Sequence, residues 1–385
     1  MAKLTIQDYL NPTLATPLGF GAMRLPGEKP ELERMIDMYL DSDYNYIDTA
    51  YVYGGSEERL RESLVMRHNR DKFFVADKLP PWHVEKSPED CEKLLTESLR
   101  RTGLDYFDFY LVHSLDDGKE QAVEDMGIFQ WCFEQKKKGL VRHVGFSFHG
   151  TTPYLARLLE RHPEAEFVQL QQNYIDNLRG PAAQWQDLAL QHNTPIIVME
   201  PVRGGSLANL PAAAEKLLKD YDPTRSVASW AIQYAATLEG TSCLLSGMSN
   251  VAQMEDNLKT FQKLKPLTAE EMTLLEKVMD EIAKAGGIPC TACKYCHSEC
   301  PVDIEIATCF SSYNELKRGS AEWNTSMMYR TIAPGHRADS CIKCGACVPI
   351  CPQHIDIPNS LKAVEKRMEP FWFGPVLWAV QKFTS

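Results

Sequence analysis

Eight short apolar runs recur along the first part of the chain, and their spacing constrains the fold more than any other feature. Each run is rich in β-branched and aromatic residues, and a segment with helical spacing of its apolar residues, such as 88–99, separates it from the next. A strand, a helix and two loops need about 30 residues, so each interval fits one strand–helix unit. The runs begin at Leu18, Asn45, Phe73, Phe107, Val141, Phe167, Pro195 and Thr241, so successive starts are 26 to 46 residues apart.

Eight strand–helix units are the number found in a (β/α)8 barrel, whose usual size is about 250 residues. The sequence therefore predicts an α/β fold of the TIM-barrel type. A doubly wound open sheet is the alternative, because periodicity alone does not distinguish a closed sheet from an open one. The barrel is predicted to end near Ala283, where Gly286, Gly287 and Pro289 interrupt a helical pattern.

The 12 cysteines of the chain are unevenly distributed. Only Cys91, Cys132 and Cys243 lie in the first 289 residues, whereas eight of the other nine form two compact runs. A disulfide scaffold would spread its cysteines through a short secreted chain, so this clustering indicates a metal or cluster domain joined to a cysteine-poor one. We therefore predict a barrel domain over 1–283 and a smaller, mainly helical di-cluster domain over 284–385.

Both cysteine runs have the spacing C-x2-C-x2-C-x3-C followed by proline. In this pattern of two-cluster ferredoxins, the first three cysteines of a run hold one [4Fe-4S] cluster and the fourth holds the other. Zinc is the alternative, although zinc sites usually take two separate C-x2-C pairs. Cys309 lies outside both patterns and is expected to be packed in the interior. The expected ligand sets are Cys290, Cys293, Cys296 with Cys351, and Cys341, Cys344, Cys347 with Cys300.

Charge and hydropathy argue against several classes of partner. The net charge is −11, from 41 basic and 52 acidic residues, and phosphate recognition usually shows a basic stripe, so we expect no nucleic-acid partner. No stretch has the roughly 20 apolar residues that span a bilayer, and the N-terminus lacks a long apolar signal core, so we expect a cytoplasmic protein. An apolar tail at 371–380 is expected to pack back onto the protein or else to bind a partner.

Ionisable residues stand at the ends of three successive predicted strands, where (β/α)8 enzymes place their catalytic groups. Asp48 ends the second strand, Lys78 the third and His113 the fourth, while Tyr53 follows Asp48 in the next loop. A tyrosine has an ordinary pKa of about 10, and a nearby ammonium lowers this pKa towards neutral pH. Each residue alone has an ordinary structural explanation. Together the four predict a site that protonates a carbonyl oxygen as a hydride arrives at the carbonyl carbon.

The motifs around these residues resemble those of the aldo/keto reductases. GFGAMRLP at 19–26, IDTAYVYGGSE at 47–57, DKLP at 77–80, LVHSL at 111–115 and VGFS at 144–147 carry the resemblance, which runs from about Leu18 to Leu258. It implies hydride transfer between NAD(P)(H) and a small carbonyl or alcohol substrate, with Tyr53 as general acid and base, supported by Asp48, Lys78 and His113. We expect the substrate pocket to be ringed by Phe20, Tyr51, Trp82, His83 and Phe148.

The resemblance also implies positions for the nicotinamide cofactor. Ser147 and Gln169 would bind the carboxamide of the nicotinamide, beside Gly21 and Met23. The pyrophosphate would lie against the segment after the seventh strand, namely Pro201, Val202, Arg203, Gly204, Gly205 and Leu207. The adenosine would be bound after the eighth strand by Gly247, Ser249, Gln253, Asp256 and Asn257. Gly247 and Gln253 stand where many relatives have Lys or Arg for the 2′-phosphate of NADPH, and Glu255 adds negative charge, so the sequence favours NADH.

The two predicted halves carry different electron chemistry. Nicotinamide transfers two electrons as a hydride, whereas each cluster carries one, so they do not exchange electrons efficiently without a flavin or similar converter, for which the sequence shows no convincing motif. Three functions stay open: a carbonyl reductase whose clusters serve structure or docking, an electron-transfer subunit that couples the barrel to a redox partner protein, and a barrel that binds or regulates without turnover. The four strand-end residues weigh against the last of these.

Overall fold

All eight predicted strands are present in the computed structural model, and each begins within one residue of its predicted start. Every neighbouring pair of strands is parallel, and the order β1 to β8 closes on itself through the pairing of β1 with β8. The fold is therefore a (β/α)8 barrel, and the open-sheet alternative is wrong. The strands are β1 (Leu18–Gly21), β2 (Tyr46–Asp48), β3 (Phe74–Leu79), β4 (Phe107–Leu115), β5 (Val141–Phe148), β6 (Val168–Gln171), β7 (Ile196–Met199) and β8 (Thr241–Ser246).

The structure describes residues 4–11, 17–85 and 87–368. The tail at 371–380, which is predicted to pack or to bind a partner, lies outside the described residues. No helix within the described part of the chain is both long enough and apolar enough to cross a bilayer.

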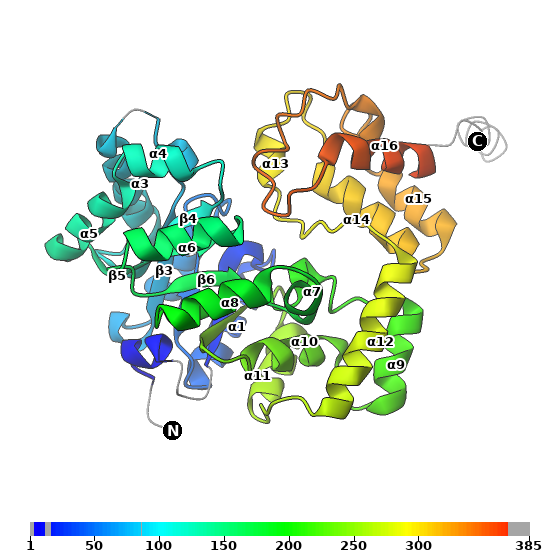
Figure 1. Cartoon of the computed structure of the whole chain (residues 1–385), viewed down its shortest axis with the longest axis horizontal. Coiled ribbons are helices and arrows are strands. Elements are labelled where there is room, and N and C mark those ends of the chain that lie inside the picture. Colours follow the sequence, from blue (N-terminus) through cyan, green and yellow to red (C-terminus); the bar gives the residue numbers. More distant parts are fainter. Residues whose placement is uncertain (1–3, 12–16, 86, 369–385) are drawn as a thin grey trace. The chain divides into compact units, whose positions relative to one another are not determined.

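Helices alternate with the strands along the chain (Figure 1). They are α1 (Lys29–Asp41), α2 (Ser56–Leu60), α3 (Pro88–Thr102), α4 (Glu120–Asp125), α5 (Ile128–Lys138), α6 (Thr152–Arg161), α7 (Tyr174–Arg179), α8 (Ala182–Gln191), α9 (Ala212–Tyr221), α10 (Val227–Ala236) and α11 (Val251–Phe261). Short helices are η1 (Ile6–Leu10), η2 (Ala22–Arg24), η3 (Arg61–Val65), η4 (Arg70–Lys72), η5 (Pro81–His83) and η6 (Arg203–Gly205).

Local sequence explains why these elements form where they do. In β4 all nine residues are buried, because helices cover the outer face of the barrel and its interior is filled. Helix α3 begins with Pro88 in its first turn, followed by two acidic residues that suit the positive end of a helix. It ends at Gly103, whose φ of 69° is the left-handed conformation that glycine adopts at helix ends.

The N-terminal helix η1 packs at the end of the barrel where the strands begin. Tyr9 is fully buried, its hydroxyl donates to Asn45 Oδ1 at 2.6 Å, and its ring lies against those of Tyr46 and Phe74. Tyr9 also belongs to the apolar cluster that contains Phe109 and other residues of five strands. Because this end is filled, the opposite end, where the strands terminate, is left for the site.

The chain divides into two compact units, and the division differs from the predicted one. The barrel unit comprises 1–202 and 228–271, and the second unit comprises 203–227 and 272–385. The segment 203–227, which follows β7 and includes α9, thus belongs with the second unit. A division of the sequence near 283 remains our proposal for the boundary between the two domain families.

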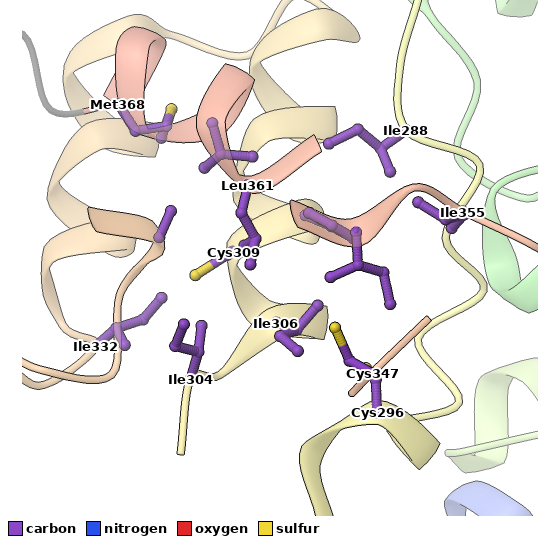
Figure 2. Close-up of a cluster of buried hydrophobic side chains, with 14 of the residues drawn as sticks. Ile288, Cys296, Ile304, Ile306, Cys309, Ile332, Cys347, Ile355, Leu361 and Met368 are labelled. Atoms are coloured by element: carbon purple, nitrogen blue, oxygen red, sulfur yellow. The ribbon is translucent and has the colours of Figure 1, made fainter. Parts of the chain in front are cut away.

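The second unit contains a core of its own, built mainly from isoleucine and cysteine side chains (Figure 2). Ile306, Cys309 and Phe310 of α14 form its centre, and Leu361 and Val364 of α16 pack against them. The helices of this unit beyond α9 are α12 (Ala269–Ala285), which begins in the barrel unit, α13 (Tyr295–Ser298), α14 (Ile306–Lys317), α15 (Glu322–Arg330), η7 (Ala338–Ser340) and α16 (Ile357–Met368).

Candidate active site and cluster sites

Asp48 and Lys78 form a buried ion pair at the carboxyl ends of β2 and β3. Lys78 Nζ lies 2.5 Å from Asp48 Oδ1 and also donates to Thr49 O at 2.7 Å. The two side chains are only 1% and 5% exposed for Lys78 and Asp48. Burial raises the pKa of Asp48 above its ordinary value, and the charge of Lys78 opposes this rise. The pair fixes the ammonium in one position.

Tyr53 lies on the loop between β2 and α2, with its ring beside the Lys78 ammonium. Lys78 Nζ is 4.9 Å from the centroid of the Tyr53 ring, and the centroid of the His113 ring is 5.9 Å away. The loop is tightly turned, because Tyr53 N donates to Ala50 O at 2.9 Å and Ser56 N donates to Tyr53 O at 2.8 Å. The structure therefore brings Tyr53, Asp48, Lys78 and His113 together as the sequence predicts.

His113 lies on β4 and is nearly fully buried. Burial, followed by the charge of Lys78, lowers the pKa of His113 well below its ordinary value. At neutral pH the imidazole is therefore uncharged and can donate an N–H without acting as an acid. The ring of Trp82 lies 5.4 Å from the His113 ring, and Lys119 Nζ is 5.5 Å from the Trp82 ring.

The two residues expected at the nicotinamide carboxamide are buried on adjacent strands. Ser147 on β5 accepts a hydrogen bond at Oγ from Ser114 N at 2.7 Å. Gln169 on β6 donates from Nε2 to Asp48 Oδ2 at 3.2 Å, so it is bonded directly to the Asp48–Lys78 ion pair. Of the other two, Gly21 ends β1 and Met23 lies in η2.

Three successive residues after β7 have backbone conformations in the left-handed region. The φ angles of Arg203, Gly204 and Gly205 are 49°, 65° and 98°. Gly204 lies against Thr291, a neighbour of Cys290, so closely that a Cβ atom would come within 2.4 Å of Thr291 O. Both residues belong to the second unit, and only glycine fits this contact.

The segment expected to bind adenosine leads into the N-terminus of α11. Asn250 caps this helix by accepting from Gln253 N at 2.9 Å, and Gln253 Oε1 accepts from Ser249 N at 2.8 Å. Asn257 donates to Gln253 O at 2.7 Å. The side chain of Gln253 therefore orders the turn before α11.

Sequence reasoning missed one acidic residue at this helix end. Glu31 of α1 accepts a hydrogen bond at Oε1 from Val251 N at 3.3 Å. Arg34, one turn further along α1, lies 3.7 Å from Glu255, with both side chains more than half exposed. Glu31 precedes Val251 by 220 residues, so no local signal could have placed the two together.

Two of the five aromatic residues expected around the substrate pocket face the surrounding helices, so the expectation is wrong for them. Phe20 is fully buried against Tyr39 of α1, with ring centroids 5.7 Å apart. Phe148 is fully buried against Tyr154 of α6 and Trp185 of α8. Successive side chains of a strand point to opposite faces, and these two point outwards. The other three form a chain of ring contacts that starts at His113. The ring of Trp82 contacts His113 and His83, and the ring of His83 contacts Tyr51.

The eight cysteines of the two runs surround two cavities in the second unit. One cavity is lined by four of them, Cys290, Cys293, Cys296 and Cys351. The other cavity is lined by Cys300, Cys341, Cys344 and Cys347. Each cavity brings together one expected ligand set, with three cysteines from one run and the fourth from the other. Within the described residues, no three His, Cys, Asp or Glu side chains are grouped closely enough to hold a single metal ion.

The two cavities are neighbours, and a backbone N–H group contacts a sulfur atom in each of them. Ile306, the first residue of α14, lines both cavities and separates them. Backbone N–H groups point at two of the sulfur atoms, from Ala292 to Cys290 at 3.3 Å and from Ile304 to Cys300 at 3.4 Å, as is usual for thiolates that hold clusters. Of the eight cysteines in the two runs, Cys344 is the exposed one.

Cys309, which we expected to be packed, is fully buried in the core of the second unit (Figure 2). It lies on α14 beside Phe310, away from both cavity linings. Its expected structural role is therefore confirmed.

Comparisons with known proteins agree with this arrangement. An oxidoreductase of uncharacterised function from Bacillus subtilis, YqkF, is 22% identical over 293 residues, which cover 67% of this chain and 91% of YqkF. The 9,11-endoperoxide prostaglandin H2 reductase of Trypanosoma cruzi is 25% identical over 281 residues, covering 71% of this chain and 90% of the reductase.

Solved structures share the barrel. The holo form of the aldo-keto reductase AKR11C1 from Bacillus halodurans is 26% identical with a TM-score of 0.54, covering 68% of this chain and 91% of that protein. An aldo/keto reductase from Klebsiella pneumoniae, solved in complex with NADP and acetate, shares the fold at 21% identity with a TM-score of 0.56, covering 68% and 90%.

Two family descriptions match separate parts of the chain. The 4Fe-4S dicluster domain matches residues 289–355, which include all eight cysteines of the two runs. The aldo/keto reductase family matches residues 17–280, which include the whole barrel and the four residues at its strand ends. The chain therefore belongs to the aldo/keto reductase family and carries a 4Fe-4S dicluster domain at its C-terminal end.

Proposed function

We propose that this chain reduces a carbonyl substrate with a nicotinamide cofactor, or oxidises the corresponding alcohol in the reverse reaction. In this proposal Tyr53 is the general acid and base. The observation that carries the proposal is the buried Asp48–Lys78 pair with its ammonium 4.9 Å from the Tyr53 ring centroid. An ammonium in this position stabilises a phenolate, so proton transfer from Tyr53 to a carbonyl oxygen becomes easier. When bound, the nicotinamide cofactor supplies or accepts the hydride.

The other residues of the site have distinct roles in this proposal. Asp48 holds the Lys78 ammonium in place, and Gln169 donates to the other oxygen of Asp48. His113 is neutral at working pH, so it orients the substrate oxygen by hydrogen bonding and leaves the proton transfer to Tyr53. Burying an ion pair costs roughly several kcal/mol per ion, because each charge loses its water. A barrel that only binds or regulates would gain nothing from this cost.

The test is a panel of aldehydes and ketones assayed under anaerobic conditions with NADH and with NADPH. The proposal expects nicotinamide oxidation that depends on a carbonyl substrate. If no carbonyl and no alcohol is turned over with either cofactor while the protein binds nicotinamide, the chain is a binding subunit.

We also propose a preference for NADH over NADPH. Residues 247–257 contain no Lys or Arg, and the N–H of Val251, the first residue of α11, donates to the Glu31 carboxylate. A carboxylate at this position repels a second anion such as a 2′-phosphate. The Klebsiella relative was solved with NADP, so a direct comparison of the two cofactors decides the preference for this chain.

For the second unit we propose two [4Fe-4S] clusters, one held in each cysteine-lined cavity. The residues present fit these groups, because each cavity is lined by four cysteines and N–H groups point at two of the sulfur atoms. Such clusters carry one electron each. Measurement of iron and acid-labile sulfide after anaerobic purification tests this, with about eight irons per chain expected.

A second candidate function is electron transfer to a redox partner protein, and one observation favours it. The second cavity reaches the surface, where Cys344 is exposed and its neighbour Ile342 is 62% exposed. An exposed cluster edge flanked by an apolar side chain suits a transient contact with a one-electron carrier. In an anaerobic titration, a cluster spectrum that changes during turnover with NADH and substrate would favour this function, and an unchanged spectrum would leave the clusters with a structural or docking role.

A further inference from the structure

Two buried carboxyl groups lie beside the four catalytic residues and take no part in the mechanism above. Asp77 precedes Lys78 on β3 and is 0% exposed, and Glu57 in the first turn of α2 is 1% exposed. Glu57 is near enough that its charge, after burial, raises the pKa of Asp77. Ionised carboxylates are acceptors only, so two carboxyl groups this close can bond to each other only by sharing one proton.

Each carboxyl group uses its second oxygen for a different partner. Asp77 Oδ1 accepts from Lys78 N at 2.6 Å, and Glu57 Oε2 accepts from Arg101 Nη1 at 2.9 Å. The remaining oxygens, Asp77 Oδ2 and Glu57 Oε1, are buried and have no hydrogen-bond partner within the described part of the chain. A single proton between these two oxygens satisfies both, as buried polar groups require.

Arg101 extends the network to the loop that carries Tyr53. The nitrogen that donates to Glu57 also donates to Tyr51 O at 3.3 Å, and the Arg101 guanidinium carbon lies 4.4 Å from the centroid of the Tyr51 ring. One guanidinium near the end of α3 therefore holds both ends of the segment 51–57, which contains Tyr53. Asp77 links the same segment to the strand that bears Lys78.

We propose that Arg101, Glu57 and Asp77 form a proton-linked bracket that positions Tyr53 against Lys78. The three are positioning residues, because they act on Tyr53 and Lys78 through the loop and the strand and do not transfer the proton themselves. The inference rests on the proposed role of Tyr53 as general acid. The bracket is intact only while the carboxyl pair keeps its proton, since two adjacent buried carboxylates repel each other.

The bracket should respond to pH with a definite sign. Burial and, next, the Glu57 charge raise the pKa of Asp77 well above its ordinary value. The folded state thus keeps a proton that the unfolded chain loses at about pH 4. The contribution of this proton to the stability of the fold is therefore full below that pH and is lost as the pH rises through the raised pKa of Asp77. The titratable groups around the pair are Lys78 on β3, Tyr110 on β4, Arg101 with Glu58 and Glu97, and Cys91 and Cys132 beside Tyr110.

The first experiment needs no substrate. Urea unfolding of the intact protein is followed between pH 5 and pH 10, roughly, for the wild type, Asp77→Asn and the exposed control Asp105→Asn. Asparagine keeps the shape and cannot ionise, so the wild type should lose stability relative to Asp77→Asn as pH rises, while Asp105→Asn should follow the wild type. Parallel pH profiles for the wild type and Asp77→Asn would overturn the shared proton.

The second experiment tests positioning. Arg101→Ala should lower kcat by about tenfold to a hundredfold with little change in nicotinamide affinity, because a small displacement of a catalytic group is costly. Arg101→Lys should recover part of the loss. Arg100→Ala is the control, because Arg100 is two-thirds exposed and pairs with Glu97. Equal kcat for Arg101→Ala and Arg100→Ala would overturn the bracket. Absence of turnover in the wild type would instead refute the proposed function, and the unfolding experiment would then decide whether the proton is shared.

Discussion

Lys78 Nζ lies 2.5 Å from Asp48 Oδ1, in an ion pair that is almost fully buried. Asp48 ends β2 and Lys78 lies on β3, so the pair bridges two adjacent strands, and the ammonium then faces the Tyr53 ring. A buried charge that loses its partner has no water to replace it. Stability and chemistry should therefore both depend on this contact.

We predict that Asp48→Asn lowers the free energy of unfolding by about 3–5 kcal/mol, because Lys78 becomes an unpaired buried charge. Urea unfolding at neutral pH measures the effect. The control is Glu62→Gln, which breaks a pair with Lys29 in which both side chains are more than half exposed, and it should cost at most about 1 kcal/mol. Equal losses in the two variants would contradict the assigned role of burial.

We predict that Tyr53→Phe lowers carbonyl reduction by at least about 100-fold while nicotinamide binding stays nearly unchanged, because only the transferred proton is removed. Steady-state turnover and cofactor fluorescence measure the two effects separately. Tyr106→Phe, which keeps an aromatic ring between Arg70 and Arg142, is the matched control and should retain activity. Undiminished turnover in Tyr53→Phe would remove Tyr53 from the mechanism.

We predict that each cavity takes ligands from both cysteine runs, and a double variant tests this. Cys300 and Cys344 line the same cavity although they belong to different runs. The variant with Cys300→Ser and Cys344→Ser should therefore keep about four of about eight irons, since the other cavity retains all its cysteines. If each run held its own cluster, both clusters would be lost and the iron content would approach zero. Cys309→Ala should keep the full iron content.

The pattern of the sequence predicted the barrel well, because the fold depends on a repeated alternation that each unit shows locally. Strand starts such as Phe107 and Val141 match to the residue, and Asp48, Lys78 and His113 converge because parallel strands of a barrel end on the same side. The cysteine spacing likewise predicted which residues would line each cavity, since short spacing constrains how sulfur atoms can meet.

Features that depend on contacts between distant segments were not predictable in this way. Phe148 follows a residue of the site, but its side chain alternates to the outer face of β5, where Trp185 covers it. Arg101 and Glu57 meet although 44 residues separate them. A motif describes the residues around a site, and the partners that hold those residues come from wherever the fold brings them.

We predict that Glu31→Gln shifts cofactor preference towards NADPH by about twofold to fivefold, because it removes a negative charge from the N-terminus of α11. Dissociation constants for NADH and NADPH, measured by fluorescence at low ionic strength, give the ratio. Glu33→Gln is the control, since Glu33 lies on the same helix and faces Arg67 at 3.8 Å. An unchanged ratio in Glu31→Gln would show that this carboxylate does not contribute to the preference.

We predict that Gly204→Ala weakens the cluster-binding loop at Thr291. The added Cβ would lie 2.4 Å from Thr291 O, so the loop that bears Cys290 and Cys293 has to move. Iron release to a chelator under anaerobic conditions, followed by absorbance, should be faster than in the wild type. Gly205→Ala separates this contact from backbone strain, because Gly205 has a φ of 98° but its Cβ would meet nothing within 4 Å. Gly204→Ala should release iron about tenfold faster than Gly205→Ala if displacement of the loop costs about 1.4 kcal/mol. Equal rates would mean that strain after β7, and not the contact with Thr291, determines how tightly the loop is held.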